Sequence, residues 1–596
     1  MICNRGTYLE TEDINQFMRF ARLLQPKQKS QSAWTPPPIT AKGLSLTARR
    51  SCSCGAPVYF SATGPLRAQD KSKRKIAFGR GQTGNRGEKV KPHAELDPAP
   101  DHRTIGTAQS LFTTHTSSPG APFFQPDGTH IFNKLTAFLR AQYPAFGFRE
   151  VLTPTMYKQS LWEQSGHWAN YKDDMFTVTR SSSHKPEAVP VEFSDGRMQP
   201  EKYVNEDTEP EEFGLKPMNC PGHCLLFQSQ RRSYRDLPIR YADFSPLHRN
   251  EISGALSGLT RVRRFHQDDG HIFCRPSQVK SEISKSLDFV RLVYQTLGFQ
   301  DYALVLSTRP KKDYIGTLDE WNRAEDQLKE ALDASKKLWS TNPGDGAFYG
   351  PKIDVIVRDS DGKKHQTATI QLDFQLPKRF LLGYEAPAPE LEAKGEPTTN
   401  SVSRQTMGTV TPVMIHRAVL GSLERFMALL LEHHNGQLPF WLSPRQVIIL
   451  TVTDNSPVIR FAENLKDSLS NTALDNLPKQ IHCRTYTVDV DDSGDSISQK
   501  IARAKNKKYN MICVVGERNI AGAKKEGEWP TLDVDVTAQP NQRKTWDAIE
   551  KIRPGSQAPV QKDRGVGSKF RKMSPGVRLR VDQCKKLMRT LTEEYL

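Results

Sequence analysis

The chain has 596 residues, of which 36% are hydrophobic, so it is long enough for more than two domains with buried cores. Its net charge of +17 favours a polyanionic partner such as nucleic acid, and no apolar run is long enough to cross a bilayer. The nine cysteines are scattered and odd in number, which argues against a disulfide framework and indicates a reducing compartment.

The first hundred residues predict an import segment. No acidic residue occurs from Ile14 to Ala68, where arginine and lysine alternate with serine, threonine and proline, as is typical of mitochondrial transit segments. Met18 opens a more typical presequence than Met1, and an ordinary basic arm is the alternative. We expect a transit segment and disordered linker over residues 1–100 and a location in the mitochondrial matrix.

A large domain is predicted over residues 101–440. Amphipathic spacing predicts helices over 131–143 and 281–299, and the apolar run 413–434 indicates a long, largely buried helix. Two polar or low-complexity stretches, at about 181–212 and 386–409, are predicted to be inserted surface loops.

After Pro439 the pattern changes to a β-α-β-α-β alternation. It predicts a smaller α/β domain with a mainly parallel sheet over 441–550. Residues 551–596 are predicted to be a basic extension, because 551–589 hold twelve basic and two acidic residues. Such a tail would bind RNA phosphates, and a solvated tail without this role is the alternative.

The stretch "VRRFHQDDGHIF" (262–273) predicts a strand with one polar face. Extended backbone alternates its side chains, so one side would present Arg261, Arg263, Phe265, Gln267, Asp269 and His271. The strand "TATIQLDF" similarly places Ile370 and Leu372 on one face and Gln371 and Asp373 on the other. Plain solvated or amphipathic strands are the alternatives to a binding site.

Three stretches resemble the signatures of threonyl-tRNA synthetases, which are class II enzymes. They are "KPMNCPGHC" from Lys216, "SPLHRNEISGALSGLTRVRRFHQDDGHIF" from Ser245 and "VMIHRAVLGSLERF" from Val413. The resemblance extends from about His102 to about Phe440. It implies an α+β catalytic domain, with an antiparallel six-stranded sheet flanked by helices, followed by the smaller α/β anticodon-binding domain.

The resemblance also implies a zinc ion held by Cys220, His271 and His416. Three protein ligands leave one coordination position open, which distinguishes a substrate-binding zinc from a closed structural one. In the family, this position binds the amino and hydroxyl groups of threonine and so excludes valine. Other nearby histidines and cysteines are interpreted as structural, namely His223, Cys224, His266, His433 and His434.

The same resemblance assigns the ATP and threonine sites. Arg249 would bind the α-phosphate of ATP and the threonine carboxylate, and Arg425 the γ-phosphate, with Mg²⁺ accompanying ATP. Phe265 would stack on adenine and Glu251 would accept from its exocyclic amine. The remaining predicted residues are Arg261, Arg263, Gln371 and Ser422 for ATP, and Gln267, Asp269, Tyr349 and Lys352 for threonine.

The implied reaction joins threonine to tRNA(Thr). Threonine carboxylate attacks the α-phosphate of ATP and pyrophosphate leaves; the terminal tRNA hydroxyl then attacks the adenylate carbonyl. Pro154 matches a proline at the family's dimer interface, so we expect a homodimer without membrane association. A prolyl- or seryl-tRNA synthetase, or a non-catalytic nucleic-acid-binding relative, is the alternative.

Two departures concern regions outside the catalytic signatures. The C-terminal domain lacks the family's usual arginine-bearing stretches, so anticodon contacts are not assigned. The catalytic resemblance begins near His102, which leaves no room before it for the family's ubiquitin-like and editing domains. We therefore expect measurable charging of serine, which differs from threonine by one methyl group.

Overall fold

The computed structural model describes residues 99–179, 212–312, 314–397, 406–472, 483–523, 530–555 and 576–596. The predicted transit segment and most of the first predicted insertion lie outside these ranges. Within them, no helix has the length and apolar character needed to span a membrane.

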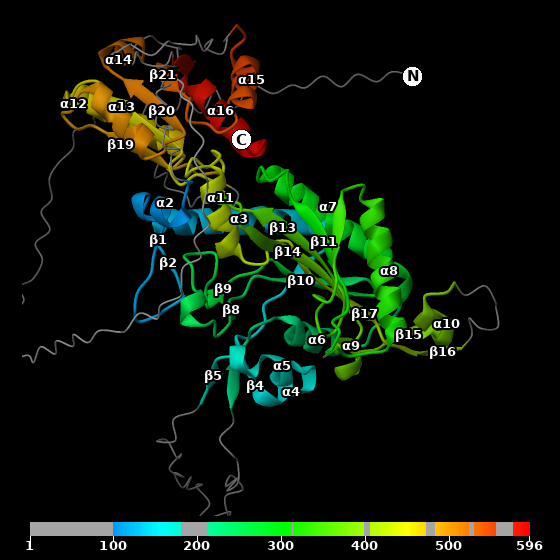
Figure 1. The fold of residues 1–596 in the computed structure, drawn as a ribbon. Coiled ribbons are helices and arrows are strands. Elements are labelled where there is room, and N and C mark those ends of the chain that lie inside the picture. Colours follow the sequence, from blue (N-terminus) through cyan, green and yellow to red (C-terminus); the bar gives the residue numbers. More distant parts are fainter. Residues whose placement is uncertain are drawn as a thin grey trace, which may run out of the picture. The chain divides into compact units, whose positions relative to one another are not determined.

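An eight-stranded sheet forms the centre of the larger domain (Figure 1). Each of its six inner strands is antiparallel to its inner neighbours, in agreement with the expected sheet. The two edge strands are parallel to their neighbours, β12 to β11 and β3 to β7. The strand order is β12 (Trp339–Asn342), β11 (Ala303–Ser307), β13 (Lys352–Arg358), β14 (Lys364–Asp373), β17 (Val413–Ala418), β10 (Asp269–Cys274), β7 (Ile239–Asp243) and β3 (Arg149–Glu150).

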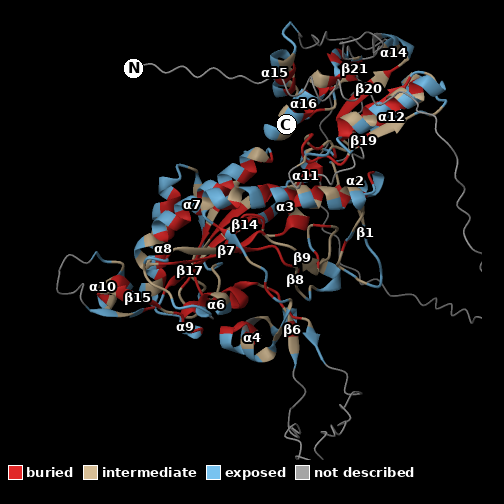
Figure 2. Cartoon of the chain, turned by 180° about the vertical axis from the view of Figure 1, so that it is seen from behind, coloured by how far each residue is buried: buried red, intermediate tan, exposed pale blue. Residues whose placement is uncertain are grey.

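Four helices cover one face of this sheet: α3 (Pro126–Phe146), α7 (Val279–Thr296), α8 (Leu318–Ala334) and α11 (Leu423–His433). In α7, Ile283, Leu287, Val290 and Tyr294 recur at helical spacing and are buried. Figure 2 shows the inner strands buried and the outer faces of α7 and α8 exposed. The two helices predicted over 131–143 and 281–299 are therefore present.

The opposite face packs against α6 (Cys220–Gln228) and α9 (Leu376–Arg379). Phe273 of β10 and Met414 of β17 share an apolar cluster with Cys220 and Phe227 of α6. Neighbouring residues Ile272 and Ile415 belong to the core on the helix-covered side. Alternate residues of β10 and β17 therefore point to opposite faces.

The prediction of one long helix over 413–434 is wrong. Residues 413–418 form strand β17, and α11 begins only at Leu423, where the Ser422 side chain caps it by accepting from the Arg425 backbone N–H. All six residues of β17 are buried. A strand buried on both faces has no apolar-polar alternation, so periodicity could not distinguish it from a buried helix.

The second predicted insertion is folded over its described residues. Strands β15 (Tyr384–Pro387) and β16 (Met407–Val410) pair, and α10 (Pro389–Lys394) follows β15. Buried Glu392 accepts from Arg275 Nη2 at 2.6 Å and from the Tyr384 hydroxyl at 2.8 Å. In place of the simple surface loop predicted for 386–409, the described residues contribute to a paired strand and a short helix that an ion pair links to Arg275.

Shorter elements complete the larger domain. The helical ones are α2 (His102–Ala108), α4 (Gln159–Ser165), α5 (His167–Tyr171), η1 (Lys172–Asp174), η2 (Ser253–Ala255) and η3 (Pro276–Gln278). The strands are β1 (Phe112–Thr113), β2 (Phe123–Phe124), β4 (Met156–Lys158), β5 (Thr177–Val178), β6 (Phe213–Leu215), β8 (Leu247–His248) and β9 (Arg264–Phe265). The predicted polar strand 262–273 is therefore interrupted between β9 and β10.

The C-terminal domain has a five-stranded sheet in the order β19 (Val488–Asp491), β18 (Val447–Thr451), β20 (Met511–Val515), β21 (Thr531–Asp535) and β22 (Val577–Arg580). Its first three strands are parallel, as predicted, whereas β21 and β22 add antiparallel pairings. Its helices are α12 (Ser456–Ser470), α13 (Ile497–Asn506), α14 (Glu517–Ala523), α15 (Gln542–Ile552) and α16 (Val581–Glu593).

The structure differs from the predicted extension over 551–596. Strand β22 pairs with β21, and α16 buries Cys584, Leu587 and Leu591 in the core of the C-terminal domain. The basic residues of β22 and α16 concealed this pattern, because they occupy the exposed positions between the apolar ones. Residues 576–596 therefore belong to the domain and do not form a separate tail.

Candidate active site

A cavity of about 420 Å³ lies over β10, β13, β14 and β17. It brings together residues that are far apart in sequence, from Cys220 to Arg425. The predicted site residues that line it are Cys220, Arg249, Glu251, Arg261, Phe265, Gln267, Asp269, His271, Tyr349, Lys352, Gln371, His416, Ser422 and Arg425. Arg263 is the exception, because its side chain lies outside the lining and its Nε donates to the Glu251 carbonyl at 2.9 Å.

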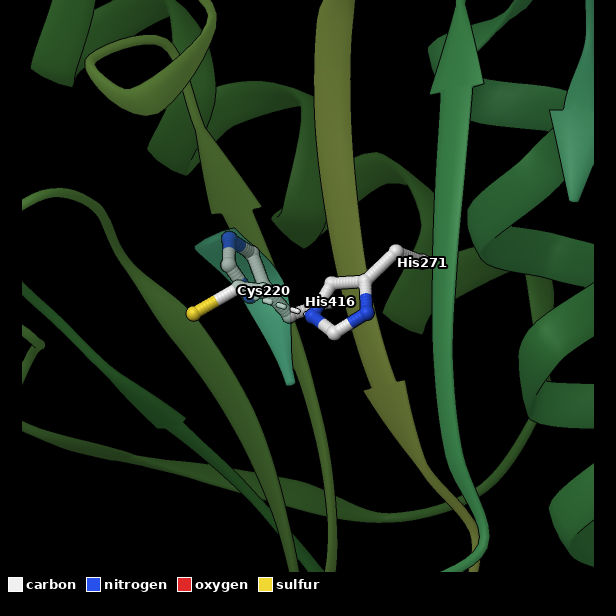
Figure 3. A group of neighbouring side chains, drawn as sticks. All are labelled: Cys220, His271 and His416. Carbon is white, nitrogen blue, oxygen red and sulfur yellow. Dashed lines mark hydrogen bonds between the residues drawn. The ribbon is translucent and has the colours of Figure 1, made fainter. Parts of the chain in front are cut away.

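Cys220, His271 and His416 meet at one end of the cavity (Figure 3). His271 and His416 are directly opposite each other in the β10–β17 pairing, and Cys220 begins α6 on the same face of the sheet. All three are buried, and their potential ligand atoms lie within 4.8 Å of one another. His271 Nε2 is 3.0 Å from His416 Nδ1, so both ring nitrogens point to the same place.

The outer nitrogen of each ring has its own partner. His416 Nε2 is 2.8 Å from Asp373 Oδ2, and His271 Nδ1 is 2.7 Å from His223 Nδ1. Protons on these outer nitrogens leave the two inner nitrogens as unprotonated acceptors, the form in which histidine binds a metal. Burial lowers the pKa of His271 and so favours this neutral state.

The donor set fits zinc. One sulfur and two imidazole nitrogens are the ligands that zinc prefers, and three of them leave a position open. Burial raises the pKa of the Cys220 thiol well above its ordinary value, so a nearby cation is needed to stabilise the thiolate. The neighbouring Cys224 is also buried, but its Sγ lies 3.9 Å from Met414 Sδ and outside the cavity lining.

A second cluster of possible ligands does not fit a metal. His102 Nδ1 is 2.7 Å from Glu432 Oε1, and its Nε2 accepts from the Leu259 backbone N–H at 3.1 Å. Both ring nitrogens are therefore already engaged. We interpret this cluster as a structural link between α2 and α11.

The other end of the cavity is strongly basic. Arg425 donates to the carbonyl oxygens of Thr260 (2.8 Å) and Gln366 (2.9 Å), and Arg249 lies over Phe265 with its guanidinium carbon 5.1 Å from the ring centroid. Within the described part of the chain, neither arginine has a carboxylate partner. Burial, followed by repulsion from Arg249, lowers the pKa of Arg425. Two guanidinium groups thus remain available for an anion.

Glu251 and Arg261 form an ion pair beside these arginines. Arg261 Nη2 lies 2.7 Å from Glu251 Oε2, and both side chains line the cavity. Strand β8 ends at His248 and a tight turn follows, so Arg249 and Glu251 do not belong to a strand. The turn nevertheless brings both side chains to the cavity.

Further polar groups line the cavity beside the arginines and the cluster of Cys220, His271 and His416. Asp269 is buried and accepts from Asn219 Nδ2 at 3.0 Å, while the Tyr349 hydroxyl donates to Gln371 Oε1 at 2.6 Å. Lys352 Nζ is 2.8 Å from Asp354 Oδ2. Together with the basic end of the cavity and the cluster of Cys220, His271 and His416, these donors and acceptors suit a small zwitterion.

Sequence reasoning missed several residues that contact the cavity lining without belonging to it. Asn219 directly precedes Cys220 and donates to Asp269, and His223, which was interpreted as structural, contacts His271. His167 Nε2 lies 3.7 Å from Cys220 Sγ. The position of Asn219 beside a predicted ligand was a usable signal. His167 comes from a short helix far away in the sequence and gave none.

Comparisons with known proteins agree with this geometry. Residues 203–434 match the model for the tRNA synthetase class II core domain (G, H, P, S and T), and residues 446–525 match the anticodon binding domain. The probable mitochondrial threonine–tRNA ligase of Schizosaccharomyces pombe is 48% identical over 423 residues, which cover 70% of this chain and 82% of that protein. The chain belongs to the threonyl-tRNA synthetase family.

Further relatives of this threonine–tRNA ligase include both mitochondrial and cytoplasmic enzymes. The mitochondrial enzyme of Saccharomyces cerevisiae is 46% identical, covering 72% of this chain and 87% of that protein. The cytoplasmic enzyme of the same yeast is also 46% identical, but the match covers 70% of this chain and 49% of that protein.

Solved structures show the same fold. A Cryptosporidium parvum threonyl-tRNA synthetase structure aligns with a TM-score of 0.59 and 41% identity, covering 73% of this chain and 92% of that one. A Giardia lamblia prolyl-tRNA synthetase aligns with a TM-score of 0.51 at 16% identity, which shows a shared fold alone. The 48% identity to a threonine–tRNA ligase sets the prolyl alternative aside. The chain is a class II enzyme that uses ATP and binds tRNA and threonine.

Proposed function

We propose that this threonine–tRNA ligase acts in mitochondria and selects threonine with a zinc ion held by Cys220, His271 and His416. The observation that supports the zinc site is the convergence of one thiol and two opposed imidazole nitrogens within 4.8 Å at one end of the cavity. When bound, zinc would supply an open coordination position for the amino and hydroxyl groups of threonine. Valine lacks the hydroxyl and would leave that position incomplete.

We propose that the protein groups around this position orient threonine. Asp269, fixed by Asn219, would accept from the threonine hydroxyl. Gln267, which lines the cavity and whose Nε2 donates to the Gly421 carbonyl at 2.8 Å, would also contact threonine. Tyr349 and Lys352 would close the other side of the threonine site.

The basic end would bind ATP and the threonine carboxylate. Arg249 can approach both the carboxylate and the α-phosphate, and Arg425 the γ-phosphate, because neither guanidinium is neutralised by a carboxylate in the described residues. Phe265 offers a face for adenine, with Glu251 to accept from its amine. Arg261, Gln371 and Ser422 complete this site, and Mg²⁺ would accompany the phosphates. Catalysis then consists of positioning and charge stabilisation.

Assembly and location are further proposals. Strand β3 is an edge of the large sheet, and Leu152, next to it and close to Pro154, is 83% exposed. An exposed edge with an apolar residue suits pairing with a second copy, so we propose a homodimer, which sedimentation analysis at micromolar concentration would test. Mitochondrial import is supported by the composition of residues 1–68 and tested by fusing them to a reporter.

The zinc proposal is tested with two matched cysteine variants. Cys220→Ala should lose bound zinc and threonine-dependent ATP–pyrophosphate exchange together, because it removes one of three ligands. Cys224→Ala, four residues later on the same helix and equally buried, should retain both. Zinc content is measured by elemental analysis. Normal exchange by metal-free Cys220→Ala would refute the proposal.

A further inference from the structure

His266 joins the two segments that would hold the ends of ATP. It lies in the gap between β9 and β10, directly after Phe265. Three hydrogen bonds connect it to the start of α11: its carbonyl accepts from the Leu423 N–H (2.8 Å), its N–H donates to Glu424 Oε2 (2.9 Å), and its Nδ1 is 2.8 Å from Glu424 Oε1. The Phe132 ring packs edge-on against the imidazole, 4.9 Å between centroids.

Neighbouring contacts extend this connection. The Asp268 N–H donates to the Leu420 carbonyl at 3.1 Å, and the Gln267 side chain donates to Gly421. Residues 266–268 therefore leave the β-ladder and bind the loop that precedes α11. The relative position of Phe265 and Arg425 depends on this connection.

Glu424 is an unusual neighbour for a polyphosphate site. Its side chain is only 1% exposed, and it immediately precedes Arg425 in the first turn of α11. Its described hydrogen-bond partners are the His266 ring and backbone, with the Ser422 hydroxyl at 3.4 Å. Glu424 does not line the cavity, whereas Ser422 and Arg425 on either side of it do.

We propose that His266 is a positioning residue for ATP that holds the Glu424 carboxylate away from the phosphates and from Arg425. Without this restraint, a buried carboxylate could rotate toward Arg425 and neutralise it, or repel the triphosphate. The inference rests on the proposed placement of ATP along the cavity. It adds a role for a side chain that does not itself contact substrate.

The test distinguishes the roles of the two ring nitrogens of His266. His266→Ala should raise the KM for ATP roughly tenfold, with the KM for threonine within about twofold of the parent value. His266→Asn, whose amide can donate from the place of Nδ1, should stay close to the parent. His266→Gln, whose amide reaches the place of Nε2, should resemble the alanine variant.

Removing the charge of Glu424 completes the cycle. Adding Glu424→Gln to His266→Ala should bring the KM for ATP back to within about threefold of the parent, because a neutral amide neither binds Arg425 strongly nor repels phosphate. If the alanine variant does not fold, the same comparison is made between His266→Gln and the double variant His266→Gln with Glu424→Gln. Equal rises in both KM values, or no restoration in the double variant, would overturn the inference.

A third variant separates this inference from the proposed function. Arg425→Ala should raise the KM for ATP if the phosphates lie where proposed. An unchanged KM would refute the placement of ATP itself. A raised KM in Arg425→Ala combined with an unchanged KM in His266→Ala would refute only the role of His266.

Discussion

Individual charged residues of the cavity differ in whether their charge is already compensated. Lys352 is paired with Asp354, and Arg261 with Glu251, whereas Arg249 and Arg425 contact only carbonyl oxygens and an aromatic face in the described part of the chain. Keeping an uncompensated guanidinium partly buried costs desolvation energy. This cost indicates that these two residues serve to bind an anionic substrate.

Asp373 shows how a residue outside the donor set can control it. Its Oδ2 is 2.8 Å from His416 Nε2, and its Oδ1 accepts from the backbone N–H groups of Gln375 (2.7 Å) and Leu376 (3.1 Å). The backbone bonds fix the carboxylate, and the carboxylate fixes the ring. Partners of this kind usually change metal affinity without abolishing it.

We therefore expect Asp373→Asn to weaken zinc binding by roughly 10- to 100-fold while the protein stays folded. The amide offers a weaker acceptor to the His416 ring. Competition with a chelator of known affinity measures the change. Asp354→Asn is the control, because Asp354 is bound by Lys352 and Ser307 and does not contact His416. Equal zinc affinities in all three proteins would contradict this assignment.

At the scale of elements, the paired strands β10 and β17 carry the proposed zinc ligands on one face and a buried ion pair on the other. His271 and His416 are opposite each other on the face covered by α6, and Gly270 and Arg417 are opposite each other on the face covered by α3 and α7. Arg417 is fully buried, pairs with Asp268, and lies 4.1 Å from the centroid of Phe148. Because the pairing register sets both faces at once, this buried ion pair also fixes the ligand geometry.

Replacing Arg417 by Met should lower the free energy of unfolding by about 3–5 kcal/mol, because it leaves the buried Asp268 carboxylate without its cation. The Tyr143 hydroxyl, 2.6 Å from Asp268 Oδ1, would be its remaining side-chain partner. Chemical denaturation measures the loss. The double variant Asp268→Asn with Arg417→Met should recover part of it. A loss under about 1 kcal/mol in the single variant would show that the pair is dispensable.

The same elements explain what the sequence could predict. The alternation of "TATIQLDF" predicted that Gln371 and Ile370 lie on opposite faces of the strand, and in the structure Gln371 lines the cavity while Ile370 lies in the core. Strand β17 escaped detection because both of its faces are buried. The pairing of His271 with His416 is a long-range contact that no local pattern contains. It was reached only through the resemblance to a family.

At the scale of the whole molecule, two domains with separate cores follow the predicted order. The boundary near Pro439 was predicted from an abrupt change of periodicity. The end of the C-terminal domain was not, since the basic residues of β22 and α16 resemble those of a tail. A test of RNA binding by the basic region should therefore neutralise lysines and arginines within 556–575, because deletion of everything after Ile552 would remove part of a core.

Amino-acid-dependent ATP–pyrophosphate exchange by the purified chain tests the central claim, that the cavity around Cys220, His271 and His416 activates threonine through its hydroxyl group. Threonine should give the highest kcat/KM. Serine retains the hydroxyl and lacks one methyl, so it should react measurably but roughly 10- to 200-fold less well, and valine should react least of the three. Exchange with none of these amino acids, or better exchange with serine, valine or proline than with threonine, would contradict the account.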